Sequence, residues 1–300
     1  MYLFNLNDSF LKYNESCLFD RTQTIKQHPK IYFHRKIGKS NNLNFKDVCL
    51  KRAFELKNIS DSNNKSLCLF WSGGIDSTVA FFSLLDVGVK NLKIAFTKES
   101  INEYPFCYDK YVKYLNKVIF HPEKTSIFVK ENVENCLFVT GEIGDQLFGN
   151  NLFAKINPIT LNKNWQHIVN KKIIEETERF VFSCPVEIKT VKEFLWWINY
   201  ALRYQYVSYK IPLAIKDLYL DKNLFNFFDS DDWNDWSVST DMEYKFYGTN
   251  IKNYKMVAKE FIFSFTKDED YKNNKLKEQY VRLYDPQFVF KKIDIKGEKS

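Results

Sequence analysis

The stretch "LCLFWSGGIDSTVAFFSLL", residues 67–85, decides the fold that we predict for this chain. It opens with an apolar run typical of a buried strand, breaks at two glycines that follow Ser72, and resumes after Asp76 as an apolar helical pattern. Glycines at the carboxyl end of a parallel strand let the backbone turn tightly and approach a ligand closely. The helix that follows directs its unpaired N–H groups and positive dipole end at the turn. The stretch therefore predicts a strand–turn–helix unit that binds phosphate.

Side chains suited to phosphates surround this turn. Hydroxyl groups supply hydrogen-bond donors, whereas Asp76 would repel a phosphate, so we expect it to hold a Mg²⁺ ion that bridges the phosphates. The spacing is not that of the Walker A loop, GxxxxGK[ST]. The alternative is an ordinary glycine-rich turn capped by Ser or Asp. The residues that we predict to bind the phosphates are Ser72, Gly73, Gly74, Asp76, Ser77 and Thr78.

Strand-like and helix-like apolar runs alternate around this stretch. Helical spacing covers residues 44–57, 77–87 and 107–117. Strands that alternate with crossover helices predict an α/β fold built on a doubly wound parallel sheet. The expected strands cover residues 67–71, 92–96, 118–120 and 136–139.

The pattern changes in the second half of the chain, where helical periodicity dominates and strand signals become rare. Helical runs cover residues 168–182, 191–209 and 253–265. We therefore expect a mostly helical half that completes the substrate site and closes over it. The predicted organisation is an N-terminal extension at 1–43, an α/β core at 44–151 and the helical region at 152–300.

The composition favours a cytoplasmic enzyme over a membrane or nucleic-acid-binding protein. No apolar run is long enough to span a bilayer, and no secretory signal opens the chain, so we expect no membrane partner. The net charge of +7 comes mostly from Lys spread along the chain. Arg, the better residue for contacts with phosphates and bases, is scarce, which disfavours a nucleic-acid partner.

The six cysteines are scattered, without a CxxC pair or a His at ligand spacing. This distribution is typical of buried apolar thiols and indicates neither a zinc site nor a disulfide framework.

A second stretch, "CLFVTGEIGDQLFGN" at residues 136–150, repeats the design of the first. A strand-like run again meets glycines and acids and then a short apolar helix start. Two carboxylates from adjacent strand ends can hold one hard cation through oxygen ligands. The alternative is a second turn whose acids are incidental.

Together the two stretches resemble a known enzyme family. "SGGIDST" resembles the SGGxDS signature of the ATP pyrophosphatase (PP-loop) superfamily, whose members split ATP between the α and β phosphates. The second stretch resembles the "SGEGxDELFGG" motif of asparagine synthetases and their relatives, the β-lactam synthetases and lasso-peptide cyclases. The resemblance implies the PP-loop (HUP-like) fold for the α/β core. The matching residues are Gly141, Glu142, Gly144, Asp145, Leu147, Phe148 and Gly149.

This resemblance implies a role for each matching acid. Asp145 would join Asp76 on Mg²⁺, and Gly141 would lie against bound ATP. Glu142 would serve the amide-forming step as a catalytic residue, because a carboxylate near the reacting carbonyl could take a proton from the attacking amine.

A weaker match lies near the C-terminus, where "KMVAKEFIFSFTKDEDYKNNKLKEQY" resembles the family's basic helix and the loop ending in a Lys-Glu pair. We align Lys277 with that lysine as the second predicted catalytic residue. A lysine there would stabilise the negative charge that develops on phosphorus and carbon in the transition states. The alternatives nearby are Lys255, Lys259, Lys272 and Lys275.

The chain also departs from the family pattern. Full asparagine synthetases begin with a glutaminase domain whose nucleophile is a cysteine after the initiator Met, but Tyr2 stands there. We therefore expect ammonia or another amine to come from an external source. Ile143 replaces the usual Gly, Gln146 replaces the usual Glu, and the segment between Asp76 and Glu142 is shorter than usual, which affects the acceptor pocket.

These features predict an ATP- and Mg²⁺-dependent ligase that adenylates a carboxylate and forms an amide. Free aspartate with ammonia is the default substrate pair, and a larger or peptide carboxylate that closes on itself is the related option. Two alternatives remain open. One is a PP-loop enzyme that modifies RNA or nucleobases, and the other is a nucleotide-binding module without catalysis.

Overall fold

The structure is a computed structural model of the 300-residue chain. It describes residues 21–22, 43–120, 125–149, 158–168, 178–204, 207–208, 222–245 and 254–275.

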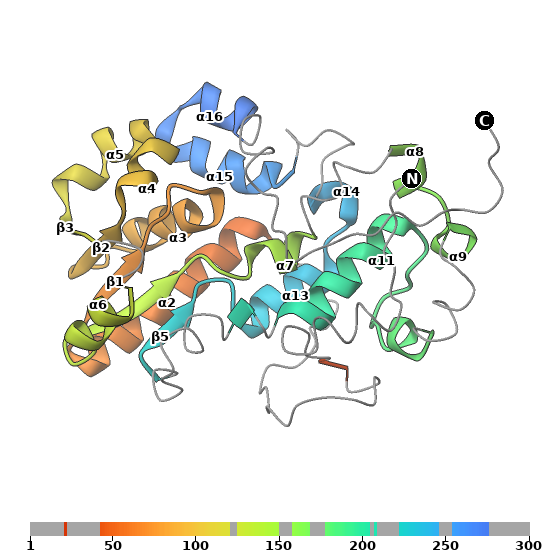
Figure 1. The fold of residues 1–300 in the computed structure, drawn as a ribbon, viewed down its shortest axis with the longest axis horizontal. Coiled ribbons are helices and arrows are strands. Elements are labelled where there is room, and N and C mark those ends of the chain that lie inside the picture. The colour runs from red at the N-terminus through yellow and green to blue at the C-terminus, as the bar shows by residue number, and fades with distance from the viewer. Residues whose placement is uncertain are drawn as a thin grey trace.

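A five-stranded sheet with all strands parallel forms the α/β half of the molecule (Figure 1). Its strands lie in the order β3-β2-β1-β4-β5, which confirms the predicted α/β class and parallel sheet. The strands are β1 (Ser66–Phe70), β2 (Leu92–Phe96), β3 (Asn116–Ile119), β4 (Cys136–Thr140) and β5 (Leu224–Asn226).

The chain turns back on itself at the middle of this sheet. From β1 it builds outward through β2 to β3, and then returns to place β4 on the other side of β1. Such a reversal of strand order opens a crevice outside the carboxyl ends of the strands, where ligands bind in open α/β sheets. The loops that follow β1 and β4 both end at this crevice.

Helices cover both faces of the sheet. Alternate residues of β1 point in opposite directions, so Leu67 and Leu69 pack in the main core, whereas Cys68 packs with Phe128 of α6 on the other face. All five residues of β4 are buried, which is typical of a central parallel strand. The helices of this half are α2 (Phe45–Asn63), α3 (Ile75–Asp86), α4 (Lys98–Glu103), α5 (Pro105–Lys110), the short η1 (Val112–Tyr114), α6 (Thr125–Asn132) and α7 (Gly144–Phe148).

The second half is mostly helical where it is described, but it also supplies β5, a strand too short to show an alternating apolar pattern. The hairpin of α15 and α16 lies against α3 (Figure 1). The helices are α8 (Pro158–Leu161), α9 (Trp165–Ile168), α11 (Val191–Ile198), the π-helical turn η4 (Asn199–Arg203), α13 (Asp231–Ser239), α14 (Met242–Lys245), α15 (Met256–Thr266) and α16 (Glu269–Asn274).

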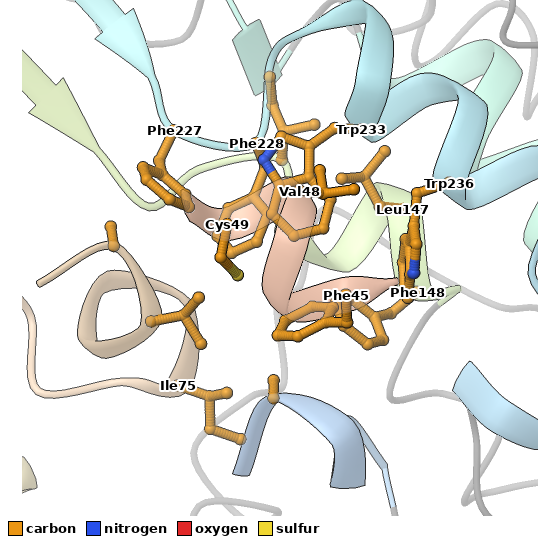
Figure 2. Close-up of a cluster of buried hydrophobic side chains, with 14 of the residues drawn as sticks. Phe45, Val48, Cys49, Ile75, Leu147, Phe148, Phe227, Phe228, Trp233 and Trp236 are labelled. Atoms are coloured by element: carbon orange, nitrogen blue, oxygen red, sulfur yellow. The ribbon is translucent and has the colours of Figure 1, made fainter. Parts of the chain in front are cut away.

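An aromatic cluster at the start of α2 joins the two halves (Figure 2). The helix begins where Asn44 accepts a hydrogen bond from the Lys46 N–H at 2.8 Å. Its first residue, Phe45, makes edge-to-face contacts with Phe148 of α7 and with Trp233 and Trp236 of α13. Aromatic pairs of this kind stabilise a core beyond their buried area, so α2 holds α7 and α13 in one body.

The sequence predicts buried thiols, and four of the five described thiols are buried. Cys49, Cys68, Cys107 and Cys136 are buried and free, and Cys184 is free and half-buried, while Cys17 lies outside the described residues. Among the helices described in the structure, none has the length and apolar character needed to cross a membrane.

Candidate active site

The loop after β1 is held by short-range hydrogen bonds. The Ser72 hydroxyl lies 2.9 Å from that of Ser77 and accepts a bond from the Gly74 N–H at 3.2 Å. The Ser77 hydroxyl in turn accepts from the Ser72 N–H at 3.1 Å. Gly73 adopts a left-handed φ of +75°, and a Cβ atom there would lie 2.5 Å from the Ser100 carbonyl oxygen. The turn therefore requires glycine for both its backbone conformation and its packing.

Helix α3 begins directly behind this loop with a residue that cannot cap it. The N-cap residue is Gly74, which has no side chain to accept a hydrogen bond from the first turn. A bound anion would satisfy those N–H groups and meet the positive end of the helix dipole. Thr78 is fully buried and its hydroxyl accepts from the Trp71 indole N–H at 3.1 Å, so it fixes the turn from inside.

The loop after β4 lies against the first one. A Cβ atom on Gly141 would come within 2.5 Å of the Ser77 backbone nitrogen, and one on Gly144 would overlap the Asp76 carboxyl group. The close approach of the two backbones therefore requires glycine at 141, whereas a side chain at 144 would displace the Asp76 carboxylate from its present position. The loops after β1 and β4 are therefore in direct contact at the carboxyl edge of the sheet.

Ile143 lies in this second loop with a left-handed backbone, φ +80° and ψ −18°. A β-branched residue rarely adopts this conformation, which costs roughly 1–2 kcal/mol relative to glycine. The Ile143 side chain is only 1% exposed, so its burial offsets part of this strain. The sequence motif that this loop resembles has Gly at this position, and the backbone of Ile143 is one that a glycine would favour.

One buried lysine joins the aspartates of the two loops. The Lys255 ammonium lies 2.6 and 2.5 Å from the two Asp76 carboxylate oxygens and 2.8 Å from Oδ1 of Asp145. The Tyr254 hydroxyl also donates to Oδ1 of Asp145, at 2.8 Å. Lys255 precedes the first turn of α15, where a left-handed φ of +56° directs the chain toward the loops.

The exposure of these groups differs. The Lys255 side chain is 3% exposed, that of Asp76 is 22% and that of Asp145 is 53%. The carboxylates therefore remain accessible to a solute while the lysine approaches them from the protein side.

The pKa values in this cluster reflect burial and pairing. Burial raises the pKa of Asp76 to about 6, against the opposing effect of Lys255, and the neighbouring Asp145 and Glu142 add to the rise. Burial also acts to raise the pKa of Asp145, but the side chain is half exposed, and Lys255 with Tyr254 brings this pKa below its usual value. Burial acts to lower the pKa of Lys255, but the two carboxylates raise it, so the ammonium keeps its charge.

Side chains of the helical half hold helix α7, which carries Asp145, in place through hydrogen bonds. The Asn199 amide donates to the carbonyl oxygens of Asp145 at 2.9 Å and of Gly149 at 2.5 Å. The Leu147 carbonyl oxygen accepts from the Trp196 indole at 3.2 Å and from the Ser237 hydroxyl at 2.8 Å. Neither Asn199 nor Ser237 stands in a recognisable sequence motif, so sequence reasoning offered no signal for them.

The remaining predicted residues have different positions. Glu142 is half-buried beside Asp76, and its N–H donates to the Thr140 hydroxyl at 3.2 Å. Lys277 lies outside the described residues. Of its four alternatives, Lys255 contacts the predicted aspartates, whereas Lys275 pairs with Glu103 at 2.5 Å.

The donor set at this edge suits a hard cation. Within the ranges that the structure describes, no group of three or more His, Cys, Asp or Glu side chains has metal-binding spacing. The two carboxylates nevertheless surround a positively charged ammonium group, which occupies the kind of position that a cation between them would take. Oxygen ligands from one or two carboxylates, completed by water and phosphate, are the usual environment of Mg²⁺.

Comparisons with protein-family models and with curated proteins found no match.

Proposed function

We propose that this protein is an ATP-dependent ligase that adenylates a carboxylate substrate and joins it to an amine, as the asparagine synthetases do. The observation that carries the proposal is the meeting of Asp76, Asp145 and Lys255 where two glycine-bent loops lie at the reversal of strand order. In many folds, sites at this place in a parallel sheet bind nucleotides. The first turn of α3 has no side-chain cap, so its backbone N–H groups can bind a phosphate.

The charges of the cluster fit a nucleotide with its metal. Two carboxylates and one ammonium carry one net negative charge, which by itself would repel a triphosphate. Asp76 and Asp145 would hold Mg²⁺, which when bound would supply positive charge opposite the phosphate groups of the pyrophosphate leaving group. A divalent ion would offset this negative charge and let the site accept ATP.

The chain's own residues would then divide the work. The N–H groups of the first turn of α3 and the Ser72 hydroxyl bind and orient phosphate oxygens. Lys255 keeps its proton beside the two carboxylates, and its positive charge would stabilise the negative charge that grows on the phosphate oxygens, which would lower the barrier electrostatically. Glu142 would accept the proton of the attacking amine. ATP itself supplies the adenylyl group that turns the carboxylate into a good electrophile.

The first experiment is a screen for AMP release from ATP and Mg²⁺ across carboxylates, with and without ammonia. We expect aspartate or a larger carboxylate to release AMP and to support exchange of pyrophosphate into ATP. Binding of ATP by calorimetry without AMP from any carboxylate would replace this proposal with a nucleotide-binding module.

Three variants test the assignment of residues. Asp76→Asn, Asp145→Asn and Lys255→Met should each lower pyrophosphate exchange by about 100-fold or more. The matched control is Lys192→Met, because Lys192 is also a buried lysine paired with one carboxylate, Glu243, away from the loops. Exchange that survives in Lys255→Met would assign the cationic role to another lysine.

A further inference from the structure

The N-terminal extension reaches the helical half through one buried arginine, Arg21. Its backbone N–H donates to the Ala201 carbonyl oxygen at 3.0 Å, and its guanidinium donates to the Tyr200 carbonyl oxygen at 3.5 Å. The guanidinium carbon lies 4.5 Å from the ring centre of Tyr200 and 4.0 Å from that of Tyr204. Arg21 is 8% exposed, so these contacts are shielded from water.

A second polar group fixes the direction of the guanidinium. Arg21 also donates to the Asn234 side-chain oxygen at 2.8 Å, which accepts from the Tyr200 hydroxyl at 2.7 Å. The Tyr204 hydroxyl donates to Asp229 at 2.8 Å. Arg21 therefore belongs to a buried hydrogen-bond network that links helix α13 to the π-helical turn η4.

The turn that Arg21 contacts is unusual. Residues 199–203 form a π-helical turn that continues α11, and such turns are rare and concentrate at functional sites. A π-helical turn contains one extra residue, so its carbonyl groups leave the regular hydrogen-bond pattern of an α-helix. Arg21 meets two carbonyl oxygens of this turn with an N–H and a charged donor, and hydrogen bonds from charged donors are stronger than neutral ones.

The same turn holds the second loop of the candidate active site. Its first residue is Asn199, which bonds the carbonyl oxygens of Asp145 and Gly149 and accepts from the Gln146 amide at 3.5 Å. A continuous path of contacts therefore runs from Arg21 through Tyr200 and Asn199 to the backbone of Asp145.

We infer that Arg21 is a positioning residue for Asp145, acting by holding the π-helical turn in the register that lets Asn199 fasten α7. Arg21 thus contributes to the candidate active site through intermediate residues. The effect on catalysis rests on the proposed ligase function, whereas the effect on the geometry of α7 does not.

Amide hydrogen exchange of the full chain tests the structural part. Arg21→Met removes the charge and the donors while keeping much of the volume, and we expect amides in 199–204 and 144–149 to exchange about tenfold faster. Arg21→Lys, which keeps the charge, should give a smaller increase. If Arg21→Met were too unstable to study, Arg21→Lys would carry the test, with a measurable increase in the same two segments.

Arg52 offers the matched control. It is 3% exposed and also donates to two backbone carbonyl oxygens, those of Phe227 at 3.2 Å and Asn226 at 3.1 Å. Arg52→Met should loosen residues 222–228 and leave 199–204 protected. Unchanged exchange in 144–149 of the Arg21 variants, or an equal increase in both arginine variants, would overturn the inference.

Kinetics test the catalytic part. Because the first loop would bind the phosphates of ATP and Asp145 only the metal, Arg21→Met should lower the kcat of pyrophosphate exchange about tenfold and change the KM for ATP less than the kcat. Faster amide exchange in 144–149 with an unchanged kcat would overturn the catalytic role of Arg21. If the wild-type protein supports no exchange with any carboxylate, the proposed function fails, and amide exchange alone still decides whether Arg21 positions α7.

Discussion

The two glycine loops of the candidate site are held in opposite ways. The first, after β1, is closed by the hydroxyls of Ser72 and Ser77, five positions apart. The second, after β4, depends on residues far along the chain: Asn199 is 54 positions from Asp145, and Tyr254 is 109 positions from it. The backbone turn of the first loop is closed by its own residues, although Asp76 also pairs with the remote Lys255, whereas the second loop exists in this form only when the helical half is folded against it.

This difference predicts which substitutions should perturb each loop. Changes inside the first loop should act on ligand contacts more than on the fold, because its hydrogen bonds are short-range and partly exposed. The second loop should respond to changes at remote positions, and its contact with the first loop leaves no room for added atoms.

The largest effect is expected at the contact between the loops. Gly141→Ala would place a Cβ atom 2.5 Å from the Ser77 backbone nitrogen, which cannot move without shifting α3. We expect it to lower the free energy of unfolding by about 3 kcal/mol. Gly88→Ala is the control, because Gly88 has φ +66° with no atom within 4 Å of the added Cβ. Backbone strain alone should lower the free energy of unfolding of the Gly88→Ala variant, measured in urea, by about 1 kcal/mol.

The next prediction compares the long-range hydrogen bonds that hold the second loop with the short-range hydrogen bonds that close the first. Asn199→Leu leaves the carbonyl oxygens of Asp145 and Gly149 without this donor, and should cost about 2 kcal/mol of unfolding free energy. Ser72→Ala removes the exposed hydroxyl of the first loop and should cost about 0.5 kcal/mol in the same measurement. Equal costs for the two variants would contradict the comparison.

A pH dependence should arise behind the second loop. Lys245 is 1% exposed, donates to the Ser237 carbonyl oxygen, and lies 4.0 Å above the ring of Trp196, the residue that bonds Leu147. Burial lowers its pKa from 10.5 to about 7. Between these two values the unfolded chain carries a proton that the folded chain lacks. Stability should therefore rise from pH 7 toward pH 10 by up to about 1.4 kcal/mol per unit.

Lys245→Met provides the comparison for this pH series. The difference in unfolding free energy between wild type and variant should change across pH 7 to 10 and be flat below pH 6. A difference that stays constant over the whole range would show that the buried amine does not titrate in this window.

The smallest effect is expected at Ile143. Ile143→Gly loses the burial of an apolar side chain and relieves the left-handed backbone strain, so the net change should stay within about 1 kcal/mol. Ile75→Gly removes a similarly buried side chain from the start of α3 without relieving any strain, and should lower the free energy of unfolding by about 2 kcal/mol. A cost at Ile143 as large as that at Ile75 would mean that its left-handed backbone carries little strain.

Several features were predictable because their signals are local. The apolar runs around residues 67–71 and 136–139 identified two central strands, and the glycines after them identified the loops. Parallel strands bring such loops to one edge of the sheet, so the meeting of Asp76 and Asp145 followed from pattern and topology. β5, with three residues, carried too short a pattern to be identified.

The sequence by itself determined the parallel α/β architecture, the two turns and the aspartates they present, because strand periodicity, glycine conformation and helix starts depend on neighbouring residues. Only the tertiary structure decided which lysine meets those aspartates and which amide fastens the second loop. Lys255 is one of many lysines in a Lys-rich chain, and Asn199 is an ordinary residue within a helical run. Their roles come from the docking of distant helices, which no short stretch of sequence encodes.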